Sequence, residues 1–265
     1  MTDLLAAYDA QVRTAVAERL PAGRELSWDG PLLRLTGGFR GFVGYRDLDG
    51  RRGRELDELI ERTVAFFDGR GESFEWKWHA HDEPADLPDR LRAHGFVAED
   101  LETVLVAHAA ALAASAHVPD DPTLRVAELR TAAELRELGA MESEIWGEDW
   151  SWLAEDLIAR RAAEGDQLRV FGIYAGRGAG DRLVSGAWLV FNPGTEFAGL
   201  WGGSTLAEFR GRGCYRRLVA IRAALAADLG YRFLQVDASP DSNPILQRLG
   251  FTPITTTRPF IHRPD

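Results

Sequence analysis

The sequence predicts an α/β protein in which helices flank mixed sheets, and three observations support this class. Segments with apolar residues every three or four positions take turns with shorter segments of strand-like alternation. The composition is that of an ordinary folded chain, with 45% hydrophobic and 27% charged residues. The two halves also share the order of these segments, and a length of 265 residues accommodates two domains.

The first half is predicted to alternate helices with short strands. Its clearest helix covers 55–67, where Leu56, Leu59 and Ile60 lie on one face. Its clearest strand covers 73–79, in which aromatic and charged residues alternate. The predicted helices are 3–20, 55–67 and 86–94, and the predicted strands are 25–28, 32–35, 39–45, 73–79 and 102–106.

The second half is predicted to restart after a segment with little apolar bulk. Residues 107–121 are rich in alanine and lead into a proline-flanked pair of aspartates. We therefore predict domains 1–116 and 122–265. Thr131, with Glu134 three residues later, has the pattern of a capping box at a helix start. The predicted helices are 131–144, 150–163, 215–229 and 242–249, and the predicted strands are 124–129, 168–174, 183–191, 196–205, 231–238 and 254–261.

Charge and cysteine content argue against several kinds of partner. The formal net charge of −10 disfavours nucleic acid, whose phosphates need a basic face. Cys214 is the only cysteine, so no intramolecular disulfide can form. The first residues lack the basic and apolar regions of a secretory signal, and no apolar run reaches membrane-spanning length. His79 and His81 share a strand end without further ligands nearby, so no metal site is predicted. These features predict a cytoplasmic protein without a membrane or nucleic-acid partner.

One glycine-rich turn has the composition of an anion site. A predicted strand ends at 203–205, and a helix follows the Arg-Gly-Arg-Gly segment of 210–213. Backbone N–H groups in the first turn of a helix have no intrahelical partner and carry partial positive charge. Glycines let an anion approach the backbone closely. The turn therefore predicts a cradle for a phosphate or a pyrophosphate.

The first half carries a degenerate copy of this turn. Residues 51–54 align with 210–213 at the same offset that aligns the strands which follow. Arg52 and Arg54 stand where the second half has its two glycines. The chain is therefore predicted to hold one anion cradle, in its second half.

Together these elements resemble the GNAT (Gcn5-related N-acetyltransferase) family. The order of strand, glycine turn, helix, strand, short helix and the Leu-Gly-Phe of 249–251 covers the second half. Arg210 and Gly213 match the phosphate loop of the family, whereas Tyr215 stands where the family has glycine or alanine. The first half resembles the partial GNAT-like domain of tandem members. The resemblance implies a GNAT fold, acetyl-CoA as co-substrate, no metal, and direct acetyl transfer to an amine held beside it.

The resemblance also implies which residues bind acetyl-CoA. Backbone N–H groups of the turn would hold the pyrophosphate, and the end of the preceding strand would pair with the pantetheine arm. Ser239 stands where the family commonly has the asparagine that opens the last short helix. The predicted acetyl-CoA-binding residues are Gly203, Ser204, Thr205, Arg210, Gly211, Arg212, Gly213, Cys214, Tyr215, Arg216 and Ser239.

Catalytic side chains match the family less closely. Several members place a glutamate eleven residues before the loop, a position that is Gly199 here. Glu196 on the same strand and Asp237 on the next are the candidate bases, with a surface charge and a structural hydrogen bond as the respective alternatives. Leu246 occupies the position of the tyrosine that often protonates the leaving thiolate. Either water supplies this proton, or the protein binds acyl-CoA without turnover.

An acidic, tryptophan-rich segment is the candidate acceptor site. Residues 141–156 hold six acids, three tryptophans and no basic residue. Carboxylates and indole faces suit an ammonium group, so a small cationic amine is the predicted acceptor. A solvated helix pair with core tryptophans is the alternative, and a peptide or protein amine is a further alternative acceptor. The predicted acceptor-binding residues are Glu144, Trp146, Asp149, Trp150 and Trp201. The oligomeric state, including a homodimer, is left open.

Overall fold

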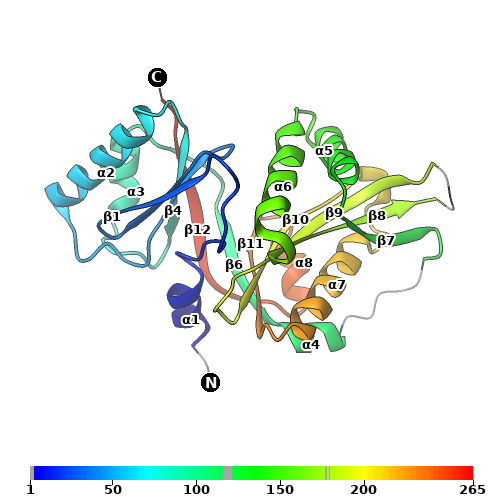
Figure 1. Cartoon of the computed structure of the whole chain (residues 1–265). Helices are drawn as coiled ribbons and strands as arrows, with labels where there is room; N and C mark the ends of the chain where they lie inside the picture. The colour runs from blue at the N-terminus through cyan, green and yellow to red at the C-terminus, as the bar shows by residue number, and fades with distance from the viewer. Residues whose placement is uncertain (1–2, 116–120, 177, 179, 265) are drawn as a thin grey trace. The chain divides into compact units, whose positions relative to one another are not determined.

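The computed structural model describes residues 3–115, 121–176, 178 and 180–264 (Figure 1). Most of the predicted domain linker therefore lies outside the described residues. The chain forms two compact units, which we call unit 1 and unit 2. Unit 1 comprises Met1–Ala15, Gly23–Leu105 and Asp237–Asp265, and unit 2 comprises Val16–Ala22 and Val106–Val236. Among the described residues no helix is long and apolar enough to cross a membrane.

Unit 1 is built on a mixed sheet whose strand order is β1-β2-β3-β4-β12. Strands β3 and β4 are parallel, and the other neighbours in this order are antiparallel. The strands are β1 (Glu25–Asp29), β2 (Leu32–Thr36), β3 (Gly41–Gly44), β4 (Phe74–His79), β5 (Val97–Ala98), which pairs with β12, and β12 (Thr252–His262). The helices are α1 (Leu4–Gln11), α2 (Gly53–Asp68), α3 (Leu87–Ala93) and α8 (Asn243–Arg248).

Helix α2 closes the core of unit 1. Its apolar face is buried, as its spacing predicted, and Phe67 stacks on Phe74 of β4 with ring centroids 4.1 Å apart. A Cβ at Gly41 would overlap the Phe67 ring, so the missing side chain lets the helix approach the sheet. Trp76 and Phe260 face each other across β4 and β12 and are fully buried. The core of unit 1 therefore draws on the far C-terminal strand.

The compact units divide the chain differently from the predicted domains 1–116 and 122–265. Residues 237–265 group with unit 1 because the second half of β12 pairs with the whole of β4 (Figure 1). This pairing runs from Thr257 opposite His79 to His262 opposite Phe74. The two strands β6 (Glu102–His108) and β11 (Phe233–Ala238) each contain a boundary between the units.

The predicted helix over 3–20 is wrong beyond Gln11. Helix α1 ends there, and the following chain turns so that Arg13 becomes buried. Its Nη1 lies 2.7 Å from Asp82 Oδ1 and its guanidinium lies over the Tyr45 ring. Apolar spacing continues to Leu20, but an ion pair that is distant in sequence decides where the helix stops.

Unit 2 is built on the strand order β7-β8-β9-β10-β11, in which β10 and β11 are parallel and the other neighbours antiparallel. Its strands besides β11 are β7 (Leu124–Leu129), β8 (Leu168–Ala175), β9 (Arg182–Phe191) and β10 (Phe197–Thr205). Its helices are α4 (Ala109–Ser115), α5 (Ala132–Trp146), α6 (Ser151–Glu164) and α7 (Cys214–Asp228), with short 3-10 turns η1 (Gly165–Gln167) and η2 (Ala207–Phe209).

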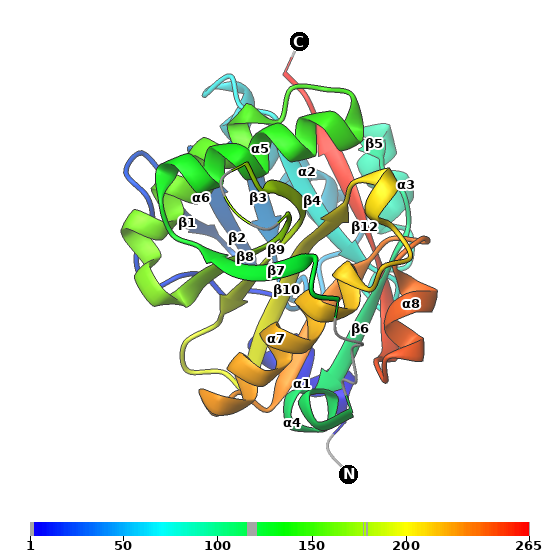
Figure 2. The same ribbon diagram turned by 90° about the vertical axis from the view of Figure 1, so that its right-hand side faces the viewer.

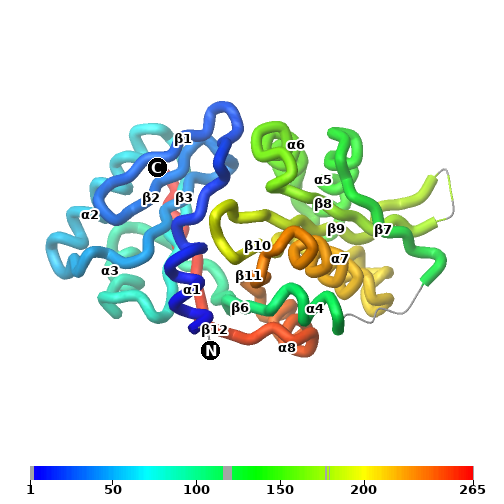
Figure 3. Tube along the Cα trace, turned by 60° about the horizontal axis from the view of Figure 1, so that its bottom comes forward, coloured from blue at the N-terminus to red at the C-terminus, as the bar shows by residue number. Residues whose placement is uncertain are grey.

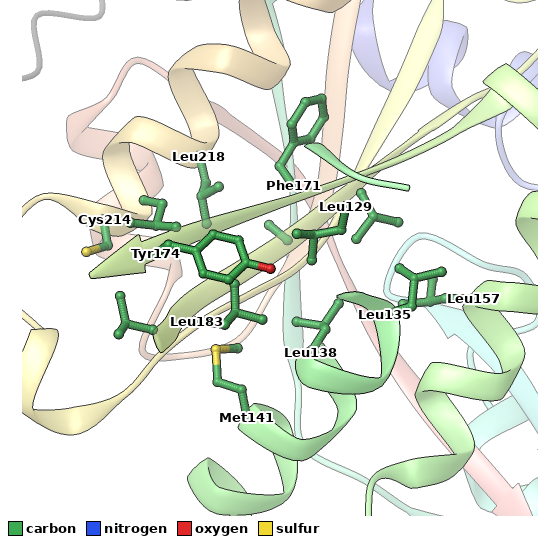
Figure 4. Close-up of a cluster of buried hydrophobic side chains, with 14 of the residues drawn as sticks. Leu129, Leu135, Leu138, Met141, Leu157, Phe171, Tyr174, Leu183, Cys214 and Leu218 are labelled. Atoms are coloured by element: carbon green, nitrogen blue, oxygen red, sulfur yellow. The ribbon is translucent and has the colours of Figure 1, made fainter. Parts of the chain in front are cut away.

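Helices α5 and α6 lie on one face of the unit 2 strands and α7 lies on the other (Figure 2). Helix α4 lies beside α7 (Figure 3). Leu138 and Met141 of α5 and Leu218 of α7 belong to one buried cluster (Figure 4). The predicted capping box is confirmed, since Thr131 Oγ1 accepts a hydrogen bond from the Glu134 N–H and the Glu134 carboxylate accepts one from the Thr131 N–H. Leu138 and Met141 also pack on Gly186 of β9, which places the second half of α5 against that strand.

Candidate active site

The turn between β10 and α7 has the backbone of an anion site. Gly213 is the N-cap of α7 in the left-handed conformation, with φ of +83°, and no side chain caps the helix. Gly211 is also left-handed, with φ of +79°, and a Cβ placed there would meet nothing within 4 Å. Both positions favour glycine because side chains rarely adopt this conformation. The N-terminus of this 15-residue helix, with its unpaired N–H groups, therefore adjoins an open turn that contains two glycines.

Three arginines flank this turn and differ in their hydrogen-bond partners. Arg212 Nη2 donates to Asp121 Oδ2 and Thr123 Oγ1, both at 2.7 Å. Hydrogen bonds from Thr123 and from Arg212 lower the pKa of Asp121 to about 2. Arg210 is exposed and donates from Nε to the Thr205 carbonyl at 3.2 Å, and Arg216 is exposed on the first turn of α7. The positive charge beside the helix terminus comes mainly from the two exposed arginines, because Asp121 offsets the third.

Cys214 and Tyr215 are packing residues at the start of α7. The Cys214 side chain is buried, which raises the pKa of its thiol, and Sγ lies 3.8 Å from the Phe209 carbonyl oxygen. The Tyr215 ring packs on Gly203, where an added Cβ would lie 2.7 Å from Tyr215 Cε2. The tyrosine that departs from the family pattern is thus accommodated by a glycine on the facing strand.

Strand β10 is interrupted by a bulge just before the turn. Its register against β9 shifts between Gly202 and Ser204, so Gly203 is the extra residue without a β9 partner. Gly202 and Gly203 have φ of +64° and +104°. Bulges bend a strand away from its neighbour, so this one opens the backbone of β10 next to the anion turn.

Arg222 of α7 donates hydrogen bonds to both strands beside the bulge. Its Nη1 donates to the carbonyls of Trp188 at 3.0 Å and Trp201 at 3.2 Å, one on each strand of the interrupted pair. Its Nε donates to Leu218 within the helix at 2.8 Å. The side chain is 1% exposed, and burial lowers the pKa of Arg222 to about 10. The buried guanidinium therefore donates to carbonyls of both strands, at the registered pair next to the bulge.

A buried carboxylate lies on the other side of the bulge. Ser204 Oγ donates a hydrogen bond to Glu142 Oε1, and Trp146 Nε1 donates to Glu142 Oε2 at 3.0 Å. Glu142 is 3% exposed. Burial raises the pKa of its carboxyl, although the bonds from Ser204 and Trp146 lower it in part. Glu142 joins the end of α5 to the strand that is predicted to bind the acyl donor.

The sequence prediction placed Glu142 within the candidate acceptor segment 141–156 but did not name it among the acceptor-binding residues. The available signal was its place in the apolar stripe of α5, at spacings of three and four with Leu135, Leu138 and Ile145. A carboxylate in such a stripe must be paired or hydrogen-bonded to be buried.

The predicted acceptor residues fall into two groups. Trp146 is 58% exposed and its ring stacks with that of Trp150 at 5.9 Å, and Trp201 on β10 is 50% exposed. Glu144 and Asp149 are engaged elsewhere. The Glu144 carboxylate lies 2.5 Å from Arg182 Nη2, and Asp149 accepts a hydrogen bond from the Ser151 N–H at the start of α6.

The two predicted bases belong to different units. Glu196 precedes β10 in unit 2, is half-buried, and pairs with Arg232 at 3.1 Å. Asp237 lies in unit 1, where its carboxylate is 3.0 Å from Lys77 Nζ, and Glu102 is 2.9 Å from the same ammonium. Ser239 is also in unit 1 and accepts a hydrogen bond from the Ser242 N–H at 3.3 Å. In both acids the carboxylate is an ion-pair partner of a neighbouring cation.

Comparison with known proteins identifies the fold. No family model and no curated protein matches the chain. A solved GCN5-related N-acetyltransferase from Kribbella flavida aligns over 99% of this chain and 95% of its own, with 17% identity and a TM-score of 0.66. The chain has a GNAT fold. A tandem GNAT protein from the clavulanic acid biosynthesis pathway aligns over 98% and 92% of the two chains, with 15% identity and a TM-score of 0.61.

A third GNAT structure, from Sphaerobacter thermophilus, has 9% identity and a TM-score of 0.56 over 90% of this chain and 82% of its own. Similarity at these identities concerns the fold. The predicted α/β class and the GNAT resemblance are confirmed, and the similarity extends over both halves of the chain.

Proposed function

We propose that unit 2 is an N-acetyltransferase that moves the acetyl group of acetyl-CoA to the amine of a small cationic acceptor. The observation that carries this proposal is the β10–α7 turn of a GNAT fold. There, the uncapped N-terminus of a 15-residue helix meets two left-handed glycines. Acyl transfer in general is what the fold supports, and the identity of the donor and acceptor is the proposal.

The residues of the turn fit a pyrophosphate. A Cβ at Gly211 would meet nothing within 4 Å, so the turn is open at this position. Arg210 and Arg216 are exposed beside it and can balance the phosphate charge. The thioester of the bound donor supplies the activated acyl group. The chain's own contribution is to hold and orient it, which is the main catalytic factor when two reactants are bound together.

The acceptor side is supported by the aromatic surface at the end of α5. Trp146 and Trp150 present stacked indole faces next to the Glu142 carboxylate, and indole faces attract cations. These residues belong to the acidic segment from which the sequence predicted a cationic amine.

A second function, binding of acyl-CoA without turnover, is favoured by two observations. The Tyr215 ring lies on Gly203, in the strand end predicted to pair with pantetheine. Leu246, in the position of the common tyrosine acid of the family, is fully buried and offers no proton.

Titration calorimetry with CoA, followed by a thiol-release assay with acetyl-CoA and a panel of alkylamines and polyamines, separates the two functions. The transferase predicts saturable CoA binding and amine-dependent release of CoASH. Binding with no release for any amine would leave the binding module, and absence of CoA binding would overturn both. Arg216→Gln should weaken CoA binding, whereas Arg136→Gln, on the exposed surface of α5, should leave it unchanged.

A further inference from the structure

An amine acceptor must lose a proton before it can attack a thioester, because alkylamines are protonated at neutral pH. Two of the acids suggested by the sequence are held in ion pairs, Glu144 with Arg182 and Glu196 with Arg232. Glu142 differs from them, since its partners in the described part of the chain are the neutral groups of Ser204 and Trp146. It is therefore a buried carboxylate of this region with basicity available for a proton.

The position of Ser204 connects Glu142 to the predicted reaction site. Ser204 directly follows the extra residue of the β10 bulge, and it is only partly buried. Its hydroxyl donates to Glu142 Oε1 and to no second acceptor side chain in the described chain, so its lone pairs remain able to accept a proton. A hydroxyl that is fixed in this way by a buried carboxylate has the arrangement of a proton relay.

We propose, on the basis of the function proposed above, that Glu142 accepts the proton of the acceptor ammonium through the Ser204 hydroxyl. Ser204 contacts the amine, and Glu142 acts through Ser204 as the positioning and proton-storing residue. The acceptor class that fits is a primary or secondary alkylamine, whose cation is attracted by the carboxylate and by the exposed Trp146 face.

The proton balance closes without a separate acid. The ammonium N–H passes its proton to Ser204 Oγ while the Ser204 proton moves to Glu142. The neutral nitrogen then forms the N–C bond to the acyl carbonyl, and the C–S bond breaks. The second proton of that nitrogen goes to the departing sulfur and yields CoASH, and Glu142 returns its proton to solvent. This route fits a chain in which leucine replaces the tyrosine acid.

The surrounding elements leave the Glu142 carboxyl in a neutral setting. Arg182 on β9 pairs with both Glu144 on α5 and Glu208 in η2. The other charged groups of α5 are also engaged, since Glu134 caps the helix start, Arg136 pairs with Glu155 on α6, and Glu137 accepts a hydrogen bond from Tyr174. Arg222 on α7 donates to main-chain carbonyls of β9 and β10. The remaining neighbours are Trp146 on α5 and Ser204 on β10. Because burial raises the pKa of Glu142, we expect the acid limb of the kcat/KM profile at a higher pH than an ordinary glutamate gives.

Glu142→Gln tests the relay, because glutamine keeps the size and can still accept from Trp146. We expect CoA binding and the melting temperature to stay as in the wild type while kcat/KM for alkylamines falls by about 100-fold or more. The acid limb should disappear, and the defect should shrink as pH rises and for an aromatic amine that is already neutral at pH 7. Ser204→Ala should give the same pattern to a smaller extent.

Glu137→Gln, at an exposed glutamate on the same helix, is the matched control and should keep the wild-type rate and profile. Wild-type turnover with an unchanged pH profile in Glu142→Gln would overturn the relay and leave the transferase intact. A loss of rate that is equal for every amine and at every pH would also overturn it, since this marks a purely structural role. If the wild type binds CoA but releases no thiol with any amine, the proposed function and the relay both fail.

Discussion

Arg222 has an unusual environment for a buried charge. Its guanidinium is 1% exposed, and its hydrogen bonds go to main-chain carbonyls of β9, β10 and α7. Burying a charge without a carboxylate is costly, which agrees with the lowering of its pKa. The cost is offset in part by its hydrogen bonds to the carbonyls of Trp188 and Trp201.

We therefore expect Arg222→Met to destabilise the protein by about 2 kcal/mol, since methionine fills the space but leaves both carbonyls unsatisfied. Urea unfolding monitored by circular dichroism measures this difference. Arg216→Met, on the exposed side of the same helix, should change stability by less than about 0.5 kcal/mol. Equal stability of Arg222→Met and the wild type would show that the bulge does not depend on this donor.

At this scale the sequence predicted the glycines of the turn but not the buried polar residues around it. The Arg-Gly-Arg-Gly segment has a local backbone reason that can be read directly. The role of Glu142 depends on Ser204, 62 residues away in the chain, and that of Arg222 depends on Trp201, 21 residues away. Such pairs depend on how helices are placed over a bulged strand, which periodicity does not give.

At the scale of single elements, helix α7 allows a comparison between its two ends. Gly211 lies before its N-terminus and Gly230 follows its C-terminus, both with positive φ, +79° and +85°. In both cases an added Cβ would meet nothing within 4 Å. The two glycines therefore differ in which end of the helix dipole they adjoin rather than in strain or space.

Gly211→Ala and Gly230→Ala should each cost about 1 kcal/mol of unfolding free energy, because alanine tolerates the left-handed conformation poorly. We expect Gly211→Ala alone to weaken CoA binding, since only its methyl would lie at the helix end that is proposed to bind the phosphates. Calorimetry with CoA measures the effect. Similar CoA affinities for the two variants would contradict the assignment of the pyrophosphate to this end of α7.

The elements themselves were predictable to the extent that they are local. Helices α2 and α5 follow from periodicity and, for α5, from its capping box. The end of α1 and the partner of β12 do not, because each depends on a contact across the sequence, Arg13 with Asp82 and Phe260 opposite Trp76. The Gly-Phe repeat correctly indicated a second GNAT-like half, but it gave no information on which half the last strand would join.

At the scale of the whole molecule, unit 1 is assembled from three chain segments, of which the first two meet around buried polar groups. Tyr8 of α1 bonds through its hydroxyl to His79 Nε2 of β4 at 3.0 Å. The neighbouring Asp82 accepts from Tyr45 at 2.5 Å and pairs with Arg13. Burial lowers the pKa of His79 to about 2, with Arg13, Lys77 and His81 adding to the effect. His79 is therefore neutral in the folded chain across the physiological range.

This neutral histidine predicts that stability falls with acid. The unfolded chain binds a proton at His79 below the ordinary histidine pKa of about 6.5, whereas the folded chain does not, so acid favours unfolding. Between pH 6.5 and pH 5 the contribution lost is about 1.6 kcal/mol, because the slope rises from half of 1.36 kcal/mol per pH unit at the unfolded pKa to nearly the full value at pH 5. Urea unfolding at both pH values measures this loss of stability.

His79→Gln should remove this part of the pH dependence, and His108→Gln, at an exposed histidine, should retain it. A pH dependence in His79→Gln as steep as in the wild type would show that the loss comes from the acidic ion pairs and not from His79.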